Sequence, residues 1–366
     1  MPVRADRLRI AAISYGLPVP GLKRGGIERV ADMLADGLAR RGHDVTVFTH
    51  DPRPAGAAYG VRALPWKRFV GTWLGRRMTM GYLGNVLAVV PNYSQFDVII
   101  AHGDSLLLPL AGKPLVRIML GSALGEARSA RSAGRFLLQM GVYGQELLTA
   151  LLQKGVVAIS DGTRRDNPFV RRTIALGFDE SIFTPEPRRR SVEPSLLFVG
   201  VLGGRKRGEF LLRLFETTIR SARPDATLTI VGEKGPPSPG VTYHVGVGDS
   251  ELAMLYRRAW LYVTPSTYEG FGLPYLEAMA CGTPVVATPN AGSLEILDQG
   301  QYGSLCSDAD FAQTVLTLLA DEHARDDLAE RGLQRARHYT LGAMLDRYEA
   351  LLFDLLQGHV RPVASL

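Results

Sequence analysis

The chain has 366 residues, of which 46% are hydrophobic and 21% charged, a composition that excludes a disordered or fibrous protein. Because this length exceeds what one hydrophobic core usually organises, we expect two domains. Residues 1–190 hold 27 Lys and Arg against 15 Asp and Glu, whereas residues 191–366 hold 15 against 21. The basic half suits an anionic lipid, a nucleic acid or a phosphorylated substrate, and equally a plain solvated surface.

The cysteine count and the lengths of the apolar runs indicate in which compartment the protein is found. Only Cys281 and Cys306 are present, so a disulfide framework and a four-cysteine zinc site are excluded, which fits a reducing compartment and predicts a cytoplasmic protein. No apolar run approaches the ~18 to 20 residues of a transmembrane helix. The basic start resembles a signal peptide, but Asp6 interrupts it and Pro18 ends its short apolar run, so we interpret it as a first strand.

Short apolar runs alternate with helix-like segments through the first half, the pattern typical of a parallel sheet built from βαβ units. Strands are predicted over residues 8–15, 43–49, 97–101, 114–119 and 156–160. Helices are predicted over residues 27–41 and 134–154.

A stretch rich in proline and arginine after Phe183 marks the predicted domain boundary. The predicted domains are residues 1–185 and 186–340, and residues 341–366 form a final helix that packs back on the first domain. In the second half, strands are predicted over residues 196–201, 226–231, 260–264 and 284–287. The fold class is therefore α/β.

The most informative segment, residues 265–295, predicts a strand, a glycine loop and a short helix. Gly270 and Gly272 permit a tight loop, Pro274 suits the first helical position, and Gly282 suits the helix end. Free loop amides and the positive end of a helix dipole bind anions such as phosphate. Glu269 is predicted in the loop and Glu277 in the first helical turn, so both carboxylates are expected to reach one cleft.

The run EGFGLPYLEAMACGTPVVAT resembles the E-x7-E region of the retaining GT-B glycosyltransferases, most closely glycosyltransferase family 4, also described as glycosyl transferases group 1. Four other segments agree with that family in order: residues 25–50, 175–185, 199–212 and 227–235. The resemblance covers most of the chain and is strongest over residues 194–300.

This resemblance implies a GT-B fold, with two Rossmann-like domains facing each other across a cleft. In the family, the first domain holds the acceptor and the second holds a nucleotide-sugar. The implied function is a retaining, metal-independent transfer of a hexosyl, deoxyhexosyl or pentosyl group from a UDP-, GDP- or dTDP-linked donor to an acceptor hydroxyl. No cofactor is implied, and no nucleic-acid partner is expected.

The resemblance also assigns donor-binding residues. Glu277 is expected to accept hydrogen bonds from the ribose hydroxyls, and Glu269 from hydroxyls of the donor sugar. The alternative for each glutamate is a surface charge near a helix start. Backbone amides of the loop are expected to hold the sugar and the phosphate; the loop residues concerned are Gly270, Phe271, Gly272 and Leu273.

Two cations are predicted to neutralise the departing diphosphate. Lys206 and its neighbour Arg205 follow a glycine pair, and their alternative is a solvated basic turn. Val201 stands where the family usually has an arginine, so either Arg205 replaces that arginine or the site has one cation fewer. Gly25 and Gly26 are expected to bring amides to the same phosphate; otherwise they form an ordinary strand-to-helix turn.

A second departure from the family is Leu120, which stands where a histidine often contacts the 6-hydroxyl of the donor sugar. An apolar side chain there predicts a donor without that hydroxyl, a 6-deoxysugar or a pentose. His102 matches another family position after a strand, and it is either a cleft residue or a structural histidine.

Metal binding has little support in the sequence. The only Asp-x-Asp pattern, Asp308 to Asp310, precedes a helical run, where N-capping explains it better than a divalent ion does. Residues 62–82 interleave five cations with Trp66, Trp73 and two other aromatic residues. This segment suits peripheral binding to the inner face of an anionic membrane, a mobile acceptor loop or a cap on the cleft.

Two other functions were weighed against a transferase. An NAD-dependent oxidoreductase on a Rossmann sheet needs G-x-G-x-x-G directly after its first strand, and the sequence SYGLPVPGLKRGG offers none. A catalytically weak nucleotide-sugar-binding protein on the same fold is suggested by Val201 and Leu120. Donor turnover distinguishes that protein from an enzyme.

Overall fold

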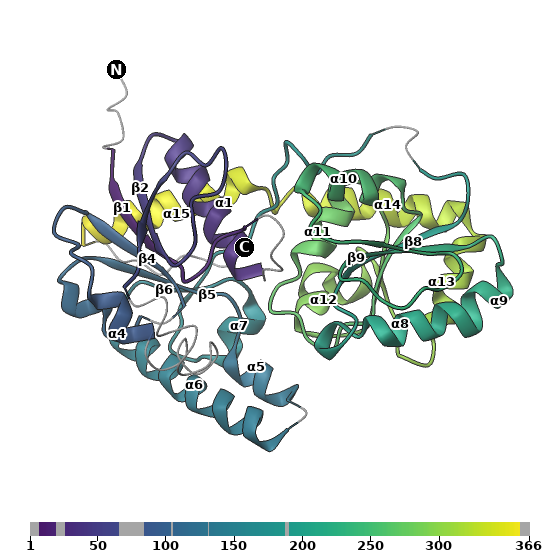
Figure 1. Cartoon of the computed structure of the whole chain (residues 1–366), viewed down its shortest axis with the longest axis horizontal. Helices are drawn as coiled ribbons and strands as arrows, with labels where there is room; N and C mark the ends of the chain where they lie inside the picture. Colours follow the sequence, from purple (N-terminus) through teal and green to yellow (C-terminus); the bar gives the residue numbers. More distant parts are fainter. Residues whose placement is uncertain are drawn as a thin grey trace. The chain divides into compact units, whose positions relative to one another are not determined.

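The computed structural model describes residues 7–19, 26–65, 84–103, 105–130, 132–186 and 190–358 (Figure 1). The chain forms two compact units, Met1–Ala175 with Met344–Leu366, and Leu176–Ala343. The boundary predicted after residue 185 therefore falls inside the second unit. The physical reason is that Phe178 forms a β-bridge with Thr340 and its amide donates to the Tyr339 carbonyl at 3.0 Å.

The first unit contains a seven-stranded parallel sheet in the order β3-β2-β1-β4-β5-β6-β7. Its strands are β1 (Arg9–Ile13), β2 (Asp44–Thr49), β3 (Gly60–Ala63), β4 (Val98–His102), β5 (Leu115–Met119), β6 (Val156–Ala158) and β7 (Arg172–Thr173). Its helical segments are α1 (Gly26–Arg40), α4 (Gly84–Val89), η2 (Leu108–Ala111), α5 (Ala123–Arg128), α6 (Ala133–Leu152) and α7 (Asp161–Asp166). The five predicted strands are confirmed, while β3 and β7 are short edge strands without an apolar run.

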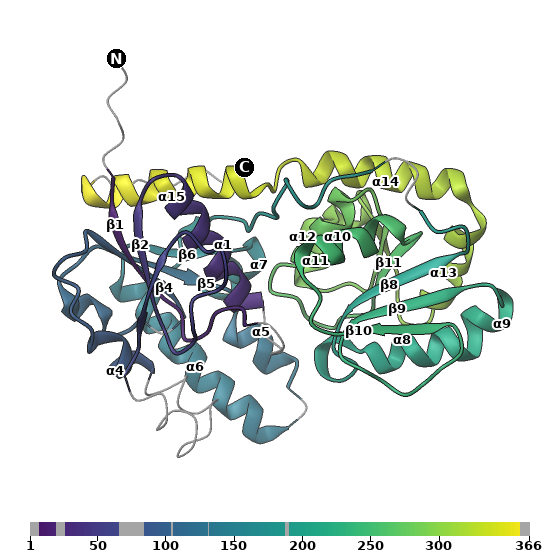
Figure 2. The ribbon, with the colours of Figure 1, turned by 45° about the horizontal axis from the view of Figure 1, so that its top comes forward.

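Helices cover both faces of this sheet, which is why β4 and β5 are buried along their whole length. On one face, the buried stripe of α1 includes Val30, Leu34 and Leu38, as its periodicity predicts. On the other face, α4 and α6 contribute to the core, and the two views agree that α6 and the C-terminal helix α15 (Leu341–Leu356) lie on opposite sides of the sheet (Figure 2).

The predicted return of the C-terminal helix to the first unit is confirmed. Arg41 of the turn after α1 pairs with Asp346 at 2.7 Å and with Glu349 at 2.5 Å, both on α15. A Cβ on Gly37 would lie 2.6 Å from a methyl group of Leu345, so a glycine in α1 allows the two helices to approach closely. Among the described helices, none is both long and apolar enough to cross a membrane.

The second unit contains a six-stranded parallel sheet in the order β10-β9-β8-β11-β12-β13. Its strands are β8 (Ser195–Gly200), β9 (Thr227–Gly232), β10 (Val241–His244), β11 (Leu261–Thr264), β12 (Val285–Ala287) and β13 (Ser304–Leu305). Its helical segments are η3 (Gly204–Lys206), α8 (Gly208–Leu214), η4 (Phe215–Ile219), α9 (Arg220–Ala222), α10 (Asp249–Arg258), α11 (Leu273–Ala280), α12 (Ala291–Ile296), η5 (Asp298–Gly300), α13 (Phe311–Ala320) and α14 (Glu322–Ala336).

In each sheet the strand order reverses at one point. In the first unit, β1 lies between β2 and β4, and in the second unit, β8 lies between β9 and β11. Open parallel sheets bind ligands outside the carboxyl ends of their strands at such a point. The loops after β1, β4, β8 and β11 are therefore the places where the fold favours a site.

Candidate active site

Three predicted catalytic residues meet where the second sheet reverses its strand order. Lys206 lies in η3 after β8, and Glu269 lies in the loop after β11, the strand that pairs with β8. The Lys206 Nζ atom is 2.6 Å from Glu269 Oε1, and the Arg205 Nη1 atom is 2.8 Å from Glu269 Oε2. One carboxylate thus holds two neighbouring cations.

The loops after β8 and β11 are joined by further bonds around Arg205. The Thr267 amide donates to the Arg205 carbonyl at 2.9 Å, and Arg205 Nη1 donates to the Tyr268 carbonyl at 2.7 Å. The Arg205 guanidinium also lies 6.0 Å from the centre of the Tyr268 ring. The Arg205 side chain is 39% exposed and that of Lys206 is 16% exposed, so the lysine is the more desolvated cation.

The environment of Glu269 keeps its carboxylate charged. Burial disfavours the charged form, but the charges of Lys206 and Arg205 and hydrogen bonds from Lys206 and Ser266 outweigh it, so the pKa of Glu269 lies below its ordinary value. Glu269 is only 6% exposed, which excludes the surface-charge alternative. The group is an anion at neutral pH that already neutralises the two cations.

The start of α12 supports the Glu269 loop from behind. The Gly292 amide donates to the Glu269 carbonyl at 3.1 Å, and a Cβ on Gly292 would lie 2.4 Å from the Phe271 carbonyl oxygen. Asn290 caps α12, and its Nδ2 atom donates to the Ser266 carbonyl at 3.0 Å. Sequence reasoning missed Asn290 and Gly292, although an asparagine three positions before a serine is a recognisable helix-start signal.

The predicted glycine loop is confirmed in its local geometry. Gly272 has φ +108°, and a Cβ there would lie 2.3 Å from the Tyr275 ring, so only glycine fits. Gly282 has φ +75° and follows the end of α11, as predicted. Pro274 occupies the second helical position instead of the first. Gly270 is partly buried, whereas Phe271 and Leu273 are buried.

Glu277 lies deeper in its helix than predicted. Because α11 begins at Leu273, Glu277 is in the second turn, and the prediction of the first turn is wrong. Its side chain is buried at 1% exposure, and Glu277 Oε2 accepts a hydrogen bond from the Tyr256 hydroxyl at 3.3 Å. Tyr256 lies on α10, and its apolar helical spacing gave no sign of this contact.

Gly26, His102 and Leu120 lie at the corresponding edge of the first unit's sheet. Gly26 is the first residue of α1, whereas Gly25 and most of residues 62–82 lie outside the described residues. His102 ends β4 and is buried. Burial lowers the pKa of His102 to about 4, against a smaller opposing effect of the Ile13 backbone, so His102 is neutral at pH 7. Leu120, directly after β5, is half-buried.

The Asp308 and Asp310 pair is not explained by N-capping as predicted. Asp310 precedes α13, but its side chain makes no capping bond and accepts from the Ser307 hydroxyl at 2.6 Å. Asp308 instead accepts two bonds from the Arg207 guanidinium, at 2.8 and 2.6 Å. Within the described ranges, no three His, Cys, Asp or Glu side chains gather as metal ligands do.

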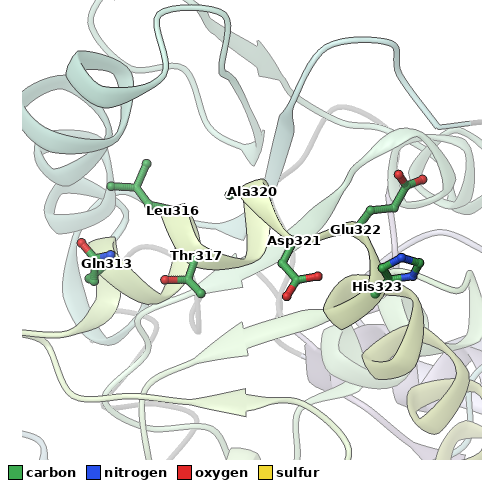
Figure 3. A pocket seen from close by; sticks show the side chains of 7 residues that line it. All are labelled: Gln313, Leu316, Thr317, Ala320, Asp321, Glu322 and His323. Carbon is green, nitrogen blue, oxygen red and sulfur yellow. The ribbon is translucent and has the colours of Figure 1, made fainter.

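A hollow of about 720 Å³ lies elsewhere in the second unit, along α13 and the start of α14 (Figure 3). Its lining residues are Gln313, Leu316, Thr317, Ala320, Asp321, Glu322 and His323. None of the predicted site residues lines it, and it does not lie at the carboxyl ends of the strands. The ion-paired cluster after β8 and β11 therefore remains the candidate active site.

Comparisons with known families and relatives agree with this arrangement. The family model described as "Glycosyltransferase Family 4" matches residues 24–166, and the one described as "Glycosyl transferases group 1" matches residues 193–321. A D-inositol 3-phosphate glycosyltransferase of Arthrobacter sp. strain FB24 is 33% identical, over 51% of this chain and about half (52%) of its own length. Another, from Corynebacterium diphtheriae, is 27% identical over 98% of both chains.

Solved structures show the same fold. Sucrose-phosphate synthase from Thermosynechococcus elongatus superposes with a TM-score of 0.80 at 23% identity, over 96% of this chain and 100% of that one. HepE of Anabaena, solved with UDP and glucose, gives a TM-score of 0.74 at 18% identity, over 95% and 100%. The two family models fall one in each unit, on the two parallel sheets described above. The chain therefore belongs to the glycosyltransferases of family 4, or group 1, and has the GT-B fold.

Proposed function

We propose that the chain transfers a glycosyl group from a nucleoside-diphosphate sugar to an acceptor hydroxyl, with retention of anomeric configuration and without a metal ion. The observation that carries this proposal is the meeting of Lys206, Arg205 and Glu269 where the second sheet reverses its strand order. Two cations at such a point suit a diphosphate, because charge grows on the leaving phosphate as the glycosidic bond breaks.

The proposed reaction needs no covalent intermediate on the protein. The bond between the anomeric carbon and the phosphate oxygen breaks, and the acceptor oxygen bonds to the same face of that carbon. The acceptor proton passes to the leaving phosphate. The contribution of the protein is then to position the reactants and to stabilise the diphosphate electrostatically.

Glu269 has two tasks in this proposal. Without a donor, its carboxylate neutralises Lys206 and Arg205. With a donor, phosphate oxygens share those cations, since a lysine has three N–H donors and an arginine five, and the carboxylate accepts hydroxyls of the sugar. Arg205 would replace the cation missing at Val201, because its guanidinium reaches the same carboxylate as Lys206 does. Glu277 and the loop amides would hold the ribose and the phosphate.

The relatives suggest which substrates to test first. HepE was solved with UDP and glucose, and two similar proteins are named D-inositol 3-phosphate glycosyltransferases. A phosphorylated polyol fits the basic first half of this chain, so UDP-sugars and an inositol phosphate are the first pair to test. A cytoplasmic location and membrane contact through residues 62–82 belong to the same proposal.

Leu120 bears on the donor sugar. An apolar side chain gives no hydrogen bond to a 6-hydroxyl, so we propose a preference for a 6-deoxysugar or a pentose. The test is the ratio of kcat/KM for two donors that share a nucleotide and differ only at C6. A hexose preferred tenfold or more would refute this preference and leave the transferase assignment intact.

The decisive experiment is turnover with UDP-, GDP- and dTDP-linked sugars, followed by NMR of the product's anomeric centre. We expect transfer with retention that persists in EDTA and falls sharply in Glu269→Gln. Inversion or loss of activity in EDTA would overturn the corresponding part of the proposal. Binding of a nucleotide-sugar without turnover on any acceptor would instead favour the weak binding protein.

A further inference from the structure

The outward face of α6 is an apolar surface on the first unit. Five large apolar side chains of this 20-residue helix are exposed, and Leu137 and Leu152 are 68% and 63% exposed. We name these five residues the α6 ridge: Phe136, Leu137, Leu148, Leu151 and Leu152. Positions 137, 148, 151 and 152 fall on one side of a helix with 3.6 residues per turn, and exposed Gly141 and Gly144 lie on that side between Leu137 and the other three.

The core of the first unit does not need this ridge. The helix packs inward through Thr149 and Ala150, and Ala150 joins a buried cluster with Met119 and Val156. Between Arg135 and Lys154 the only charged residue is Glu146, which accepts from the Ala123 amide at 3.1 Å and lies opposite the ridge on the helix. The outward face of α6 is therefore uncharged over most of its length.

The part of the chain that contains the ridge has an excess of cations. Residues 123–173 hold eight Lys and Arg against four Asp and Glu. Three of those acids pair with arginines: Glu126 with Arg135, Asp161 with Arg164, and Asp166 with Arg128.

Three exposed cations outside those ion pairs are Lys154, Arg165 and Arg171. Exposed Lys154 follows the end of α6 directly. The Tyr143 hydroxyl donates to the Asp166 carbonyl at 2.7 Å, which brings the end of α7 against α6. Exposed Arg165 and Arg171 flank this contact along the chain. The segments that flank the ridge in the chain therefore carry an excess of positive charge.

We propose that the α6 ridge docks the first unit on an anionic lipid bilayer. The helix would lie in the plane of the interface, with the ridge at the acyl boundary and Lys154, Arg165 and Arg171 on the head groups. A second copy of this chain on the same face would bring two equally basic surroundings together, so the charge favours lipid. This surface is separate from the membrane contact proposed for residues 62–82, and the docking does not require glycosyl transfer.

Sedimentation with vesicles tests the docking. We expect the full chain to bind vesicles of equimolar phosphatidylcholine and phosphatidylglycerol, less so in high salt, and to bind pure phosphatidylcholine weakly. Replacing Leu137, Leu148, Leu151 and Leu152 by Gln should abolish binding, whereas Leu110→Gln, an exposed apolar residue elsewhere in the first unit, should not. Lys154→Gln, Arg165→Gln and Arg171→Gln should each weaken binding about fivefold.

A labelled cysteine provides a readout that does not depend on a multiple variant. In a Cys306→Ser background, a polarity-sensitive fluorophore on Leu148→Cys should shift to the blue with anionic vesicles, and the same label on Leu110→Cys should not. No binding to anionic vesicles, or full binding by the folded four-leucine variant, would overturn the proposal. A dimer that the four-leucine substitution makes monomeric, with no vesicle binding by either protein, would assign the ridge to a second copy.

Discussion

The two sheets reverse their strand order in the same way, yet the described side chains at the two points differ in chemistry. After β8 and β11, the charged groups of Lys206 and Arg205 each lie within 2.8 Å of the Glu269 carboxylate. At the ends of β1, β2 and β4 lie Tyr15, His50 and His102, where Tyr15 and His50 stack with ring centres 6.3 Å apart and His102 is buried and neutral.

This contrast shows that the shared topology provides a site edge at the carboxyl ends of the strands but does not determine which side chains occupy it. The second unit concentrates charge where a charged leaving group would be stabilised, whereas Tyr15, His50 and His102 at the first unit's edge carry aromatic rings. The predictions below test whether the contrast is functional.

The largest effect is expected from Lys206, the more buried of the two cations. Lys206→Ala should reduce kcat by ~10²- to 10³-fold, because a desolvated cation facing developing charge contributes most in the transition state. The donor KM should change much less. Steady-state kinetics measure both parameters. A kcat within threefold of the wild type would show that Lys206 does not stabilise the leaving diphosphate.

The next effect concerns Glu277. Glu277→Ala should weaken donor binding by about 1.5 to 3 kcal/mol through lost hydrogen bonds to a charged group. Calorimetric titration with the true donor measures this loss, and Tyr256→Phe is the matched control, since it removes only the bond to Glu277 and should have a smaller effect. Unchanged donor affinity in Glu277→Ala would show that the buried carboxylate has a purely structural role.

The third prediction concerns the neutral edge of the first unit. The pKa of His102 is lowered from 6.5 to about 4 in the folded protein, so the unfolded chain binds more protons between these values. Stability is therefore lost as the pH falls from about 6.5 towards 4, by about 2 kcal/mol between pH 7 and pH 5. Urea unfolding at both pH values should show a smaller loss in His102→Gln, and equal losses in both proteins would mean that His102 is not buried neutral.

The smallest effect is expected from Arg205. Because its side chain is more exposed and solvent screens it more, Arg205→Ala should lower kcat by only about tenfold. Arg205→Lys keeps the charge and should recover part of the activity. If Arg205→Ala is as active as the wild type, one cation is enough and Arg205 does not replace the arginine missing at Val201.

Much of the fold was predictable because its central strands are long apolar runs. The strands β1, β4, β8 and β11 all appear where the sequence predicts them. No strand was predicted at the sheet edges, because two to four residues of mixed polarity show no recognisable hydrophobic period. The strands missed in this way are β3, β7, β10 and β13. Residues 176–185 belong to the second unit because Phe178 pairs with Thr340, a contact so distant in the chain that no local pattern indicates it.

The site was predictable where its residues belong to one contiguous motif. One loop and the helix that follows it contain Glu269, Gly272 and Glu277, so local sequence alone places these residues near one another. The contacts of Tyr256 and Asn290 depend on how α10 and α12 pack against that motif. The spacing of residues in the sequence does not reveal this packing. The pairing of Glu269 with Lys206 spans 63 positions and depends on β8 and β11 being neighbours in the sheet.

The path of α15 has a consequence for how the protein is made. The second unit is continuous in the chain, but the first also needs α15 from Met344 onwards, which is synthesised after the second unit. During synthesis, the second unit is complete before the first is, although the first began earlier. Until Leu345 is synthesised, the face of α1 around Gly37 stays uncovered, so loss of α15 damages the unit whose synthesis begins first.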